Sequence, residues 1–137
     1  MFKKSLIITI VIFTLFSCSI DDDSSNLSIE TLPIKEAIVP TEFIFGESYT
    51  LKVIYDLPSG CHSFYDLFYQ YEGTARIVAI NSIVDNNQTG CTLALIEKEY
   101  TFIVNVRQQE DYTFKFWKGT DGNGDDIFEE IVVPVSI

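Results

Sequence analysis

The stretch YTLKVIYDL, residues 49–57, alternates apolar and polar side chains and decides the fold class. Its odd-numbered positions carry large apolar side chains, namely Tyr49, Leu51, Val53 and Tyr55. Polar residues fall between them, and only Ile54 departs from the alternation. Successive side chains of a strand point to opposite faces, so this stretch predicts a strand with one face in a hydrophobic core.

Two further stretches near the C-terminus show the same alternation. In YTFIVNV (100–106) and DYTFKFW (111–117) every second side chain is large and apolar: Tyr100, Phe102, Val104 and Val106, then Tyr112, Phe114 and Phe116. The segment GTDGNGDD (119–126) is rich in turn-forming residues, so we expect it to join the 111–117 strand to IFEEIVVPV (127–135) in a hairpin. Pro134 lacks an amide N–H, which predicts an edge position for the end of the last strand.

The central segment also has the character of a sheet. HSFYDLFYQYE (62–72) has the length of a helix, but it lacks strong helix formers. TARIVAINSIVD (74–85) is rich in β-branched residues, so the two segments predict a hairpin that turns at Glu72–Gly73. An earlier strand is expected from Ile34 to Val39, closed by Pro40. About seven short strands with frequent turns predict an all-β, immunoglobulin-like β-sandwich.

The N-terminus has the layout of an export signal. Lys3 and Lys4 precede LIITIVIFTLF (6–16), which carries no charge and is too short for a spanning helix of about 20 apolar residues. The adjoining LFSC (15–18) resembles the lipobox that the bacterial lipoprotein signal peptidase cuts. This resemblance implies that Cys18 becomes the first residue of the mature chain and carries the lipid that anchors it in a membrane.

An acidic run follows the cysteine directly. SIDDD (19–23) resembles the export signal of Bacteroidota surface lipoproteins, which implies an outer-membrane position facing the cell exterior. A plainer interpretation is a solvated tether, kept extended because like charges repel. We therefore predict a lipoprotein signal peptide over 1–17, an acylated cysteine with an acidic flexible tether over 18–30, and a β-sandwich domain over 31–137.

The charge of the whole chain restricts its partners. Its 137 residues carry 20 acidic and 9 basic side chains, a formal net charge of −11. Nucleic-acid binding needs a basic surface that displaces counterions from phosphate, so no nucleic-acid partner is expected. Hydrophobic residues make up 47% of the chain, which is enough to fill the core of one domain.

Two cysteines remain after the proposed lipid site, and the chain is expected to be exported. Outside the cytoplasm such a pair predicts a disulfide. If 62–72 and 74–85 form a hairpin, the loop after it returns to the level of residue 61. Cys61 and Cys91 then lie at the same end of the domain, where their Cα atoms can reach the roughly 4.4 to 6.8 Å that a disulfide requires.

The sequence offers little for catalysis. His62 is the only histidine and follows Cys61 directly. Neighbours on a strand point to opposite faces, and a disulfide consumes the thiol. One histidine and two cysteines also cannot supply the four ligands of a zinc site. We predict no enzyme and no catalytic residue.

The loop DGNGDD (121–126) has some features of a calcium site. Asp121, Asn123 and Asp125 alternate like the first three oxygen ligands of a calcium loop, and Glu129 is a further candidate ligand. Asp126 replaces the glycine of that motif, and Val132 stands at its twelfth position. A plain hairpin turn also explains these residues. We therefore expect no cofactor, with calcium as the only alternative that we consider.

An aromatic surface is the remaining candidate for recognition. If Tyr112, Phe114 and Phe116 face the core, Trp117 and Lys115 share the outer face of that strand. Tyr65, Tyr69 and Tyr71 share one face of their own strand and are candidates to extend the patch. The alternative is that these aromatic side chains belong to the core.

Two functional hypotheses from different classes follow. The first is a surface-tethered binding module of the bacterial envelope, whose ligand is a protein partner or a glycan. The alternative is a structural or accessory subunit of an envelope complex, with no ligand of its own. An aromatic patch on the folded domain favours the first hypothesis, whereas a bare sheet edge or a broad apolar face favours the second.

Overall fold

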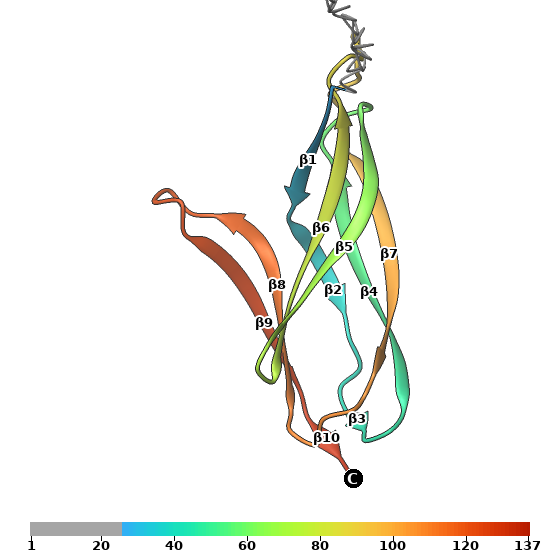
Figure 1. Ribbon diagram of the computed structural model, residues 1–137, viewed down its shortest axis with the longest axis vertical. Helices are drawn as coiled ribbons and strands as arrows, with labels where there is room; N and C mark the ends of the chain where they lie inside the picture. The colour runs from blue at the N-terminus through green and yellow to red at the C-terminus, as the bar shows by residue number, and fades with distance from the viewer. Residues whose placement is uncertain (1–25) are drawn as a thin grey trace, which may run out of the picture.

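The computed structural model describes residues 26–137, which fold into a β-sandwich (Figure 1). Its strands are β1 (Leu27–Leu32), β2 (Ile34–Ile38), β3 (Phe43–Ile44), β4 (Ser48–Leu57), β5 (His62–Glu72), β6 (Ala75–Asp85), β7 (Ile96–Asn105), β8 (Tyr112–Thr120), β9 (Asp126–Val133) and β10 (Val135–Ser136). Within this range no helix has the length and apolar character needed to cross a membrane. The predicted signal peptide, Cys18 and the acidic run at 19–23 lie outside the described residues.

The larger sheet is built around β6. One edge of β6 pairs antiparallel with β5. The other edge pairs antiparallel with β1 over Ile80–Asp85 and parallel with β8 over Ala75–Val78. β9 pairs with β8 and is an outer strand of this five-stranded sheet, as is β5 on the opposite side of β6. The second sheet has the order β2–β4–β7, and β3 and β10 form a short parallel pair.

The core lies between the two sheets and contains the side chains that the alternation predicted. Leu51, Val53 and Tyr55 of β4 are buried, as are Tyr112, Phe114 and Phe116 of β8. Phe43 of β3 packs edge-on against Tyr112, with the ring centroids 5.2 Å apart. The all-β, immunoglobulin-like sandwich is therefore confirmed.

Each of the seven expected strands is present, as β2 and β4 to β9. The β5–β6 hairpin is confirmed: Glu72 pairs with Ala75, and Gly73 in the turn has a φ of 60°, a conformation that glycine adopts without strain. The β8–β9 hairpin is confirmed as well, and Pro134 directly follows β9 on the edge of its sheet.

Two boundaries differ from the sequence expectation. β1 begins at Leu27, so residues 27–30 of the expected tether form a strand that pairs with β6. Five of its six side chains are exposed, which leaves little hydrophobic pattern from which to predict a strand. β7 begins at Ile96 rather than at Tyr100 and pairs with the whole of β4.

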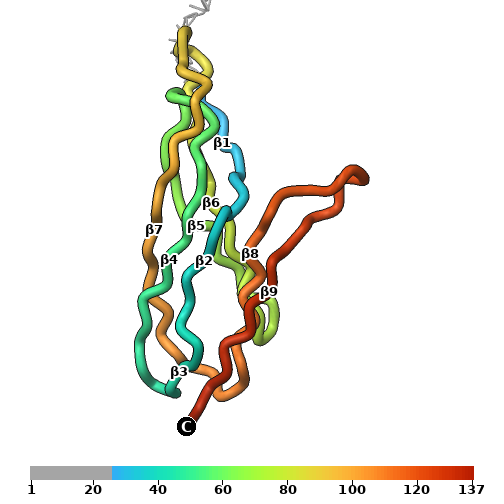
Figure 2. The backbone as a smooth tube through the Cα atoms, turned by 180° about the vertical axis from the view of Figure 1, so that it is seen from behind, coloured from blue at the N-terminus to red at the C-terminus, as the bar shows by residue number. Residues whose placement is uncertain are grey.

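The β8–β9 hairpin leaves the body of the sandwich. Pairing between β6 and β8 ends at Val78 and Phe116, and beyond that point β8 pairs only with β9. The two views agree that the hairpin diverges from the other strands as it approaches its turn (Figures 1 and 2). The divergence leaves Trp117, the residue after Phe116, at the bend.

Candidate binding sites

Cys61 and Cys91 form a disulfide at the end of the sandwich where β1 begins, which we call the disulfide end. Cys61 lies between β4 and β5 and Cys91 between β6 and β7, with their Cα atoms 5.5 Å apart. The Gly60 N–H donates to the Thr92 carbonyl at 2.9 Å, and a Cβ at Gly60 would lie 2.8 Å from the Thr92 hydroxyl oxygen. The predicted disulfide is confirmed, and close backbone contact accompanies it.

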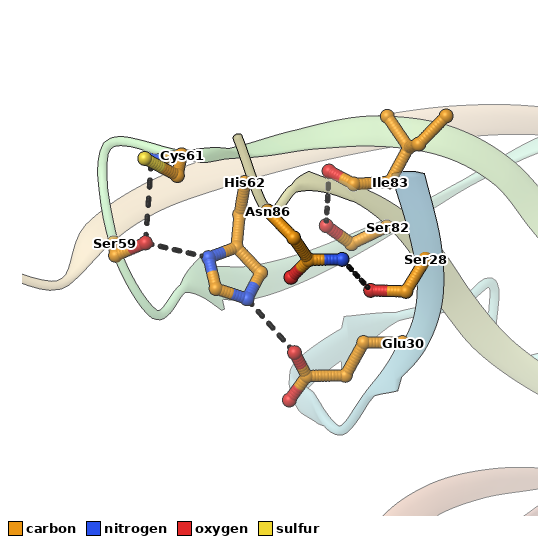
Figure 3. Close-up of polar contacts among 8 residues, drawn as sticks. All are labelled: Ser28, Glu30, Ser59, Cys61, His62, Ser82, Ile83 and Asn86. Carbon is orange, nitrogen blue, oxygen red and sulfur yellow. Dashed lines mark hydrogen bonds and ion pairs between the residues drawn. The ribbon is translucent and has the colours of Figure 1, made fainter. Parts of the chain in front are cut away.

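The histidine beside Cys61 is bonded through both ring nitrogens (Figure 3). Its Nδ1 lies 2.7 Å from Ser59 Oγ, and its Nε2 lies 2.8 Å from Glu30 Oε2. The Cys61 N–H donates to the same Ser59 oxygen at 3.2 Å. This Ser59–His62–Glu30 chain connects the β4–β5 turn to β1.

Serine, histidine and glutamate are also the residue types of a nucleophile, a base and an acid. Ser59 is only 6% exposed, and its oxygen already accepts the Cys61 N–H. The Ser59 hydroxyl is thus engaged by two neighbours within the same turn, and we interpret the chain as a structural contact. The sequence did not reveal it because Glu30 stands 32 positions before His62, in a segment expected to be a tether.

The loop proposed as a calcium site uses its first carboxylate to close the turn. Asp121 Oδ1 accepts the backbone N–H of Asn123 at 2.8 Å and that of Asp125 at 3.0 Å. Glu129 lies on β9, where its carboxylate contacts Lys118 Nζ at 2.8 Å. Within residues 26–137 no three His, Cys, Asp or Glu side chains gather in a way that would hold a metal ion. The geometry gives the calcium interpretation no support.

A groove opens on the outer face of the five-stranded sheet at the bend of the β8–β9 hairpin. We call it the Trp117 groove; its volume is about 280 Å³ and its lining includes Thr31, Phe68, Gln70, Trp117, Asp126 and Phe128. The indole Nε1 of Trp117 donates to Asp126 Oδ1 at 2.9 Å, which fixes the orientation of the ring. The groove therefore combines three aromatic side chains with a few polar groups, a composition that is typical of ligand sites.

The five residues predicted for binding do not form one surface. Trp117 and Lys115 do share the outer face of β8, where Lys115 Nζ contacts Glu72 Oε1 at 3.0 Å. Tyr69 and Tyr71 instead pair with Val78 and Arg76, whose side chains face the opposite sheet. In place of the tyrosines, Phe68 and Phe128 extend the Trp117 groove.

An irregularity in β5 separates Tyr65 from Tyr69 and Tyr71. The pairing register between β5 and β6 shifts between Phe64 and Asp66, which leaves Tyr65 as an extra residue. An extra residue reverses which positions face inward, so a regular alternation across 65, 69 and 71 does not hold. Tyr65 is 51% exposed and does not line the Trp117 groove.

A second opening, which we call the Arg76 cleft, lies between the sheets, away from the disulfide end. Its volume is about 350 Å³, and its lining includes Tyr69, Tyr71, Arg76, Arg107, Gln108 and Tyr112. Burial raises the pKa of the Tyr69 hydroxyl to about 12, even though the nearby positive charge of Arg76 acts in the opposite direction. Tyr69 is thus a neutral hydroxyl at physiological pH. No local sequence signal points to this cleft, because its members come from β5, β6, β7, β8 and the turn before β8.

Comparison with known proteins gives one result. Residues 51–133 match the model of a family described as the ORF11 beta-sandwich domain. The searches against curated proteins and against solved structures found no match. The matched range covers more than half of the chain and extends from β4 to β9, which together supply most of the core. The chain therefore belongs to the ORF11 beta-sandwich domain family.

Proposed function

We propose that this protein is a lipid-anchored binding module of the bacterial outer membrane, displayed toward the cell exterior, and that its Trp117 groove binds a neutral glycan. The observation that carries the binding role is the groove itself, an aromatic recess on a sheet face with an indole held in place. No catalytic activity is part of the proposal.

The chemistry of the groove favours a glycan over a protein partner. A pyranose ring presents C–H groups on one face and hydroxyl groups at its rim. Trp117, Phe68 and Phe128 supply aromatic faces for the C–H groups. Gln70 and Thr31 supply an amide and a hydroxyl beside them, which are uncharged groups that bond sugar hydroxyls.

The anchor rests on LFSC (15–18) and the acidic residues that follow it. Further support comes from the loop between β6 and β7, which adjoins the start of β1 (Figure 1). Residues 86–95 of this loop carry no charge, and Leu93 and Leu95 are 86% and 69% exposed. An uncharged loop with exposed leucines is suited to face a membrane surface rather than bulk water.

The groove is tested through its own tryptophan, because Trp117 is the only one in the chain. We expect the emission of the full-length protein to shift saturably with at least one of cellohexaose, maltohexaose and mannohexaose. Phe128→Ala, which removes one aromatic wall, should weaken the response by about tenfold. Lys52→Gln, on the other sheet, is the control that should leave it unchanged.

If none of the three glycans shifts the emission at concentrations of about 1 mM, the glycan assignment is wrong. A response that Phe128→Ala leaves intact would mean that binding occurs elsewhere on the molecule.

The anchor is tested separately. Intact mass of the protein from a bacterial membrane fraction should correspond to a chain that begins at Cys18 and carries lipid. Cys18→Ser should move the protein to the soluble fraction, and protease treatment of whole cells should remove the wild-type protein. An unlipidated mass would overturn the anchor.

A structural subunit is the second candidate, and one observation favours it. β7 and β9 are edge strands, and each exposes a large apolar side chain, Ile103 on β7 and Val132 on β9. Exposed apolar edges are suited to pairing with another chain. Chemical crosslinking on whole cells that joins residues of β7 or β9 to an envelope protein would favour this function over glycan binding.

A further inference from the structure

The Arg76 cleft contains a buried positive charge with no acidic partner. Arg76 is 5% exposed, and no carboxylate of residues 26–137 lies within ion-pair distance of it. Burying a charge is costly unless it is paired. The described part of the chain therefore does not neutralise this arginine, and a negatively charged ligand would do so.

Two N–H groups of the Arg76 guanidinium are not used by its hydrogen bonds to the backbone and to Gln108. Nη1 donates to the carbonyls of Gly73 at 3.3 Å and Ala75 at 2.9 Å, and Nη2 donates to Gln108 Oε1 at 2.7 Å. Nε is buried and has no partner. A guanidinium carries five N–H groups, so the Nε–H and one Nη2–H have no backbone or amide acceptor. Within residues 26–137 the only side-chain group beside them is the neutral Tyr69 hydroxyl, which contributes no negative charge. Two donors on one guanidinium match the two oxygens of a carboxylate.

The surroundings hold the guanidinium in place for such a contact. The Tyr71 ring lies 4.2 Å from the Arg76 Cζ atom and the Tyr112 ring 4.9 Å from it. Aromatic faces stabilise the cation without neutralising it. Tyr71 is 69% exposed, so its ring also faces the solvent at the cleft.

The cleft is locally cationic on an acidic protein. The chain has two arginines, Arg76 and Arg107, and both line the cleft, whereas none of the lining residues is acidic. Nearby carboxylates have other partners, because Glu72 contacts Lys115 and Asp111 accepts the Val135 N–H. The net charge of −11 repels anions generally, so this concentration of both arginines favours one specific anionic group.

We propose that the Arg76 cleft binds the carboxylate of an acidic sugar of the uronic-acid class. The carboxylate meets the Nε–H and Nη2–H of Arg76, and the sugar ring lies against the exposed Tyr71. A cleft of about 350 Å³ is the size of a small-ligand site rather than of a protein interface. This site is separate from the Trp117 groove and does not depend on the proposal made for that groove.

The test is calorimetry of the full-length protein with trigalacturonate and with its methyl ester, in which each carboxylate is replaced by an uncharged methyl ester group. We expect the acid to bind and the ester to bind about tenfold more weakly or not at all. Arg76→Lys keeps the charge but loses the paired donors, so it should weaken binding of the acid by about tenfold. Lys52→Gln removes a positive charge on the other sheet and should leave binding unchanged.

Tyr71→Ala provides a variant whose folding is not at risk, because the side chain is mostly exposed. It should weaken binding of trigalacturonate, while thermal unfolding stays cooperative and its midpoint falls only slightly because the contact with the Arg76 cation is lost. Equal affinity for acid and ester, no binding of either, or binding of an acidic peptide in place of the acid would each overturn the proposal. None of these results affects the Trp117 emission assay with neutral glycans. The two binding proposals are therefore tested independently.

Discussion

Each end of the sandwich contains a basic side chain in a polar cluster. The two side chains differ in how many of their nitrogen atoms have a hydrogen-bond partner. At the disulfide end His62 has a partner on both ring nitrogens, Ser59 and Glu30. In the Arg76 cleft the guanidinium keeps Nε without a partner, although the residue is almost fully buried. At the disulfide end, His62 has all its hydrogen-bond partners beside a covalent crosslink. In the Arg76 cleft, the arginine lacks a partner beside an opening.

This difference separates a structural role from a binding role. Buried polar groups in folded proteins are normally bonded, so a complete cluster contributes to stability and an incomplete one needs a separate explanation. The disulfide end connects β1, the β4–β5 turn and the β6–β7 loop. The Arg76 cleft gains its missing partner when a ligand arrives. Variants at the disulfide end should therefore change stability, and variants in the cleft should change binding.

The largest effect is expected from the disulfide. Replacing Cys61 and Cys91 together by alanine should lower the free energy of unfolding by about 3 to 4 kcal/mol, because the crosslink restricts the unfolded chain. Urea denaturation of wild type and variant measures this loss. A loss below about 1 kcal/mol would mean that the other contacts at this end are sufficient without the crosslink.

Next in size is the histidine contact. His62→Ala should lower the free energy of unfolding by about 2 kcal/mol, since the buried Ser59 hydroxyl then keeps only the Cys61 N–H as a partner and Glu30 loses its contact. Glu30→Gln keeps an oxygen that can bond His62 and should cost less than about 1 kcal/mol, as expected for an exposed partner. If His62→Ala is as mild as Glu30→Gln, the chain from Ser59 to Glu30 does not stabilise the disulfide end.

A smaller change is expected when the guanidinium in the cleft is removed. Arg76→Met should alter the free energy of unfolding by less than about 1 kcal/mol, because the lost hydrogen bonds are offset by removal of a buried, unpaired charge. The same variant should abolish binding of trigalacturonate. A stability loss above about 3 kcal/mol would make Arg76 a structural residue and would remove the contrast between the two ends.

The smallest effect is a pH dependence that arises from Tyr69. Its pKa of about 12 in the folded protein lies above the value of 10.0 for a free tyrosine. The unfolded state therefore releases this proton first, so the stability that the neutral hydroxyl contributes is complete below about pH 10 and decreases as the pH rises toward 12. Denaturation of wild type and Tyr69→Phe at pH 9 to 12 should show a steeper decline for wild type. Parallel declines would contradict the shift.

The parts of the fold that follow from local pattern were predictable. The alternation in 49–57 and 111–117 identified the inward side chains, and the turn residues at 72–73 and 119–126 identified two hairpins. The spacing of Cys61 and Cys91 around the β5–β6 hairpin predicted the disulfide. Each of these signals lies within one segment or between two adjacent segments, where the period of a strand and the geometry of a turn apply directly.

The features that escaped prediction depend on contacts between distant segments. β1 has few buried side chains and becomes a strand because β6 offers it an edge. The regular pairing that starts at the β5–β6 turn directs Tyr69 and Tyr71 toward the opposite sheet, and the extra residue at Tyr65 separates Tyr65 from them; the alternation by itself contains no signal for such a shift. Trp117 was correctly placed on the outer face, whereas its neighbours Phe68 and Phe128 required the sheet order.

The amino-acid sequence by itself determined that this chain is all-β, which side chains of the regular strands turn inward, and that two cysteines meet. Only the tertiary structure decided that Glu30 reaches His62, that Phe68 joins Trp117 in one groove, and that Arg76 is buried without an acid. The physical reason is that side-chain alternation is a local property of the backbone. Whether a charge finds its partner depends instead on the order and register in which the strands assemble.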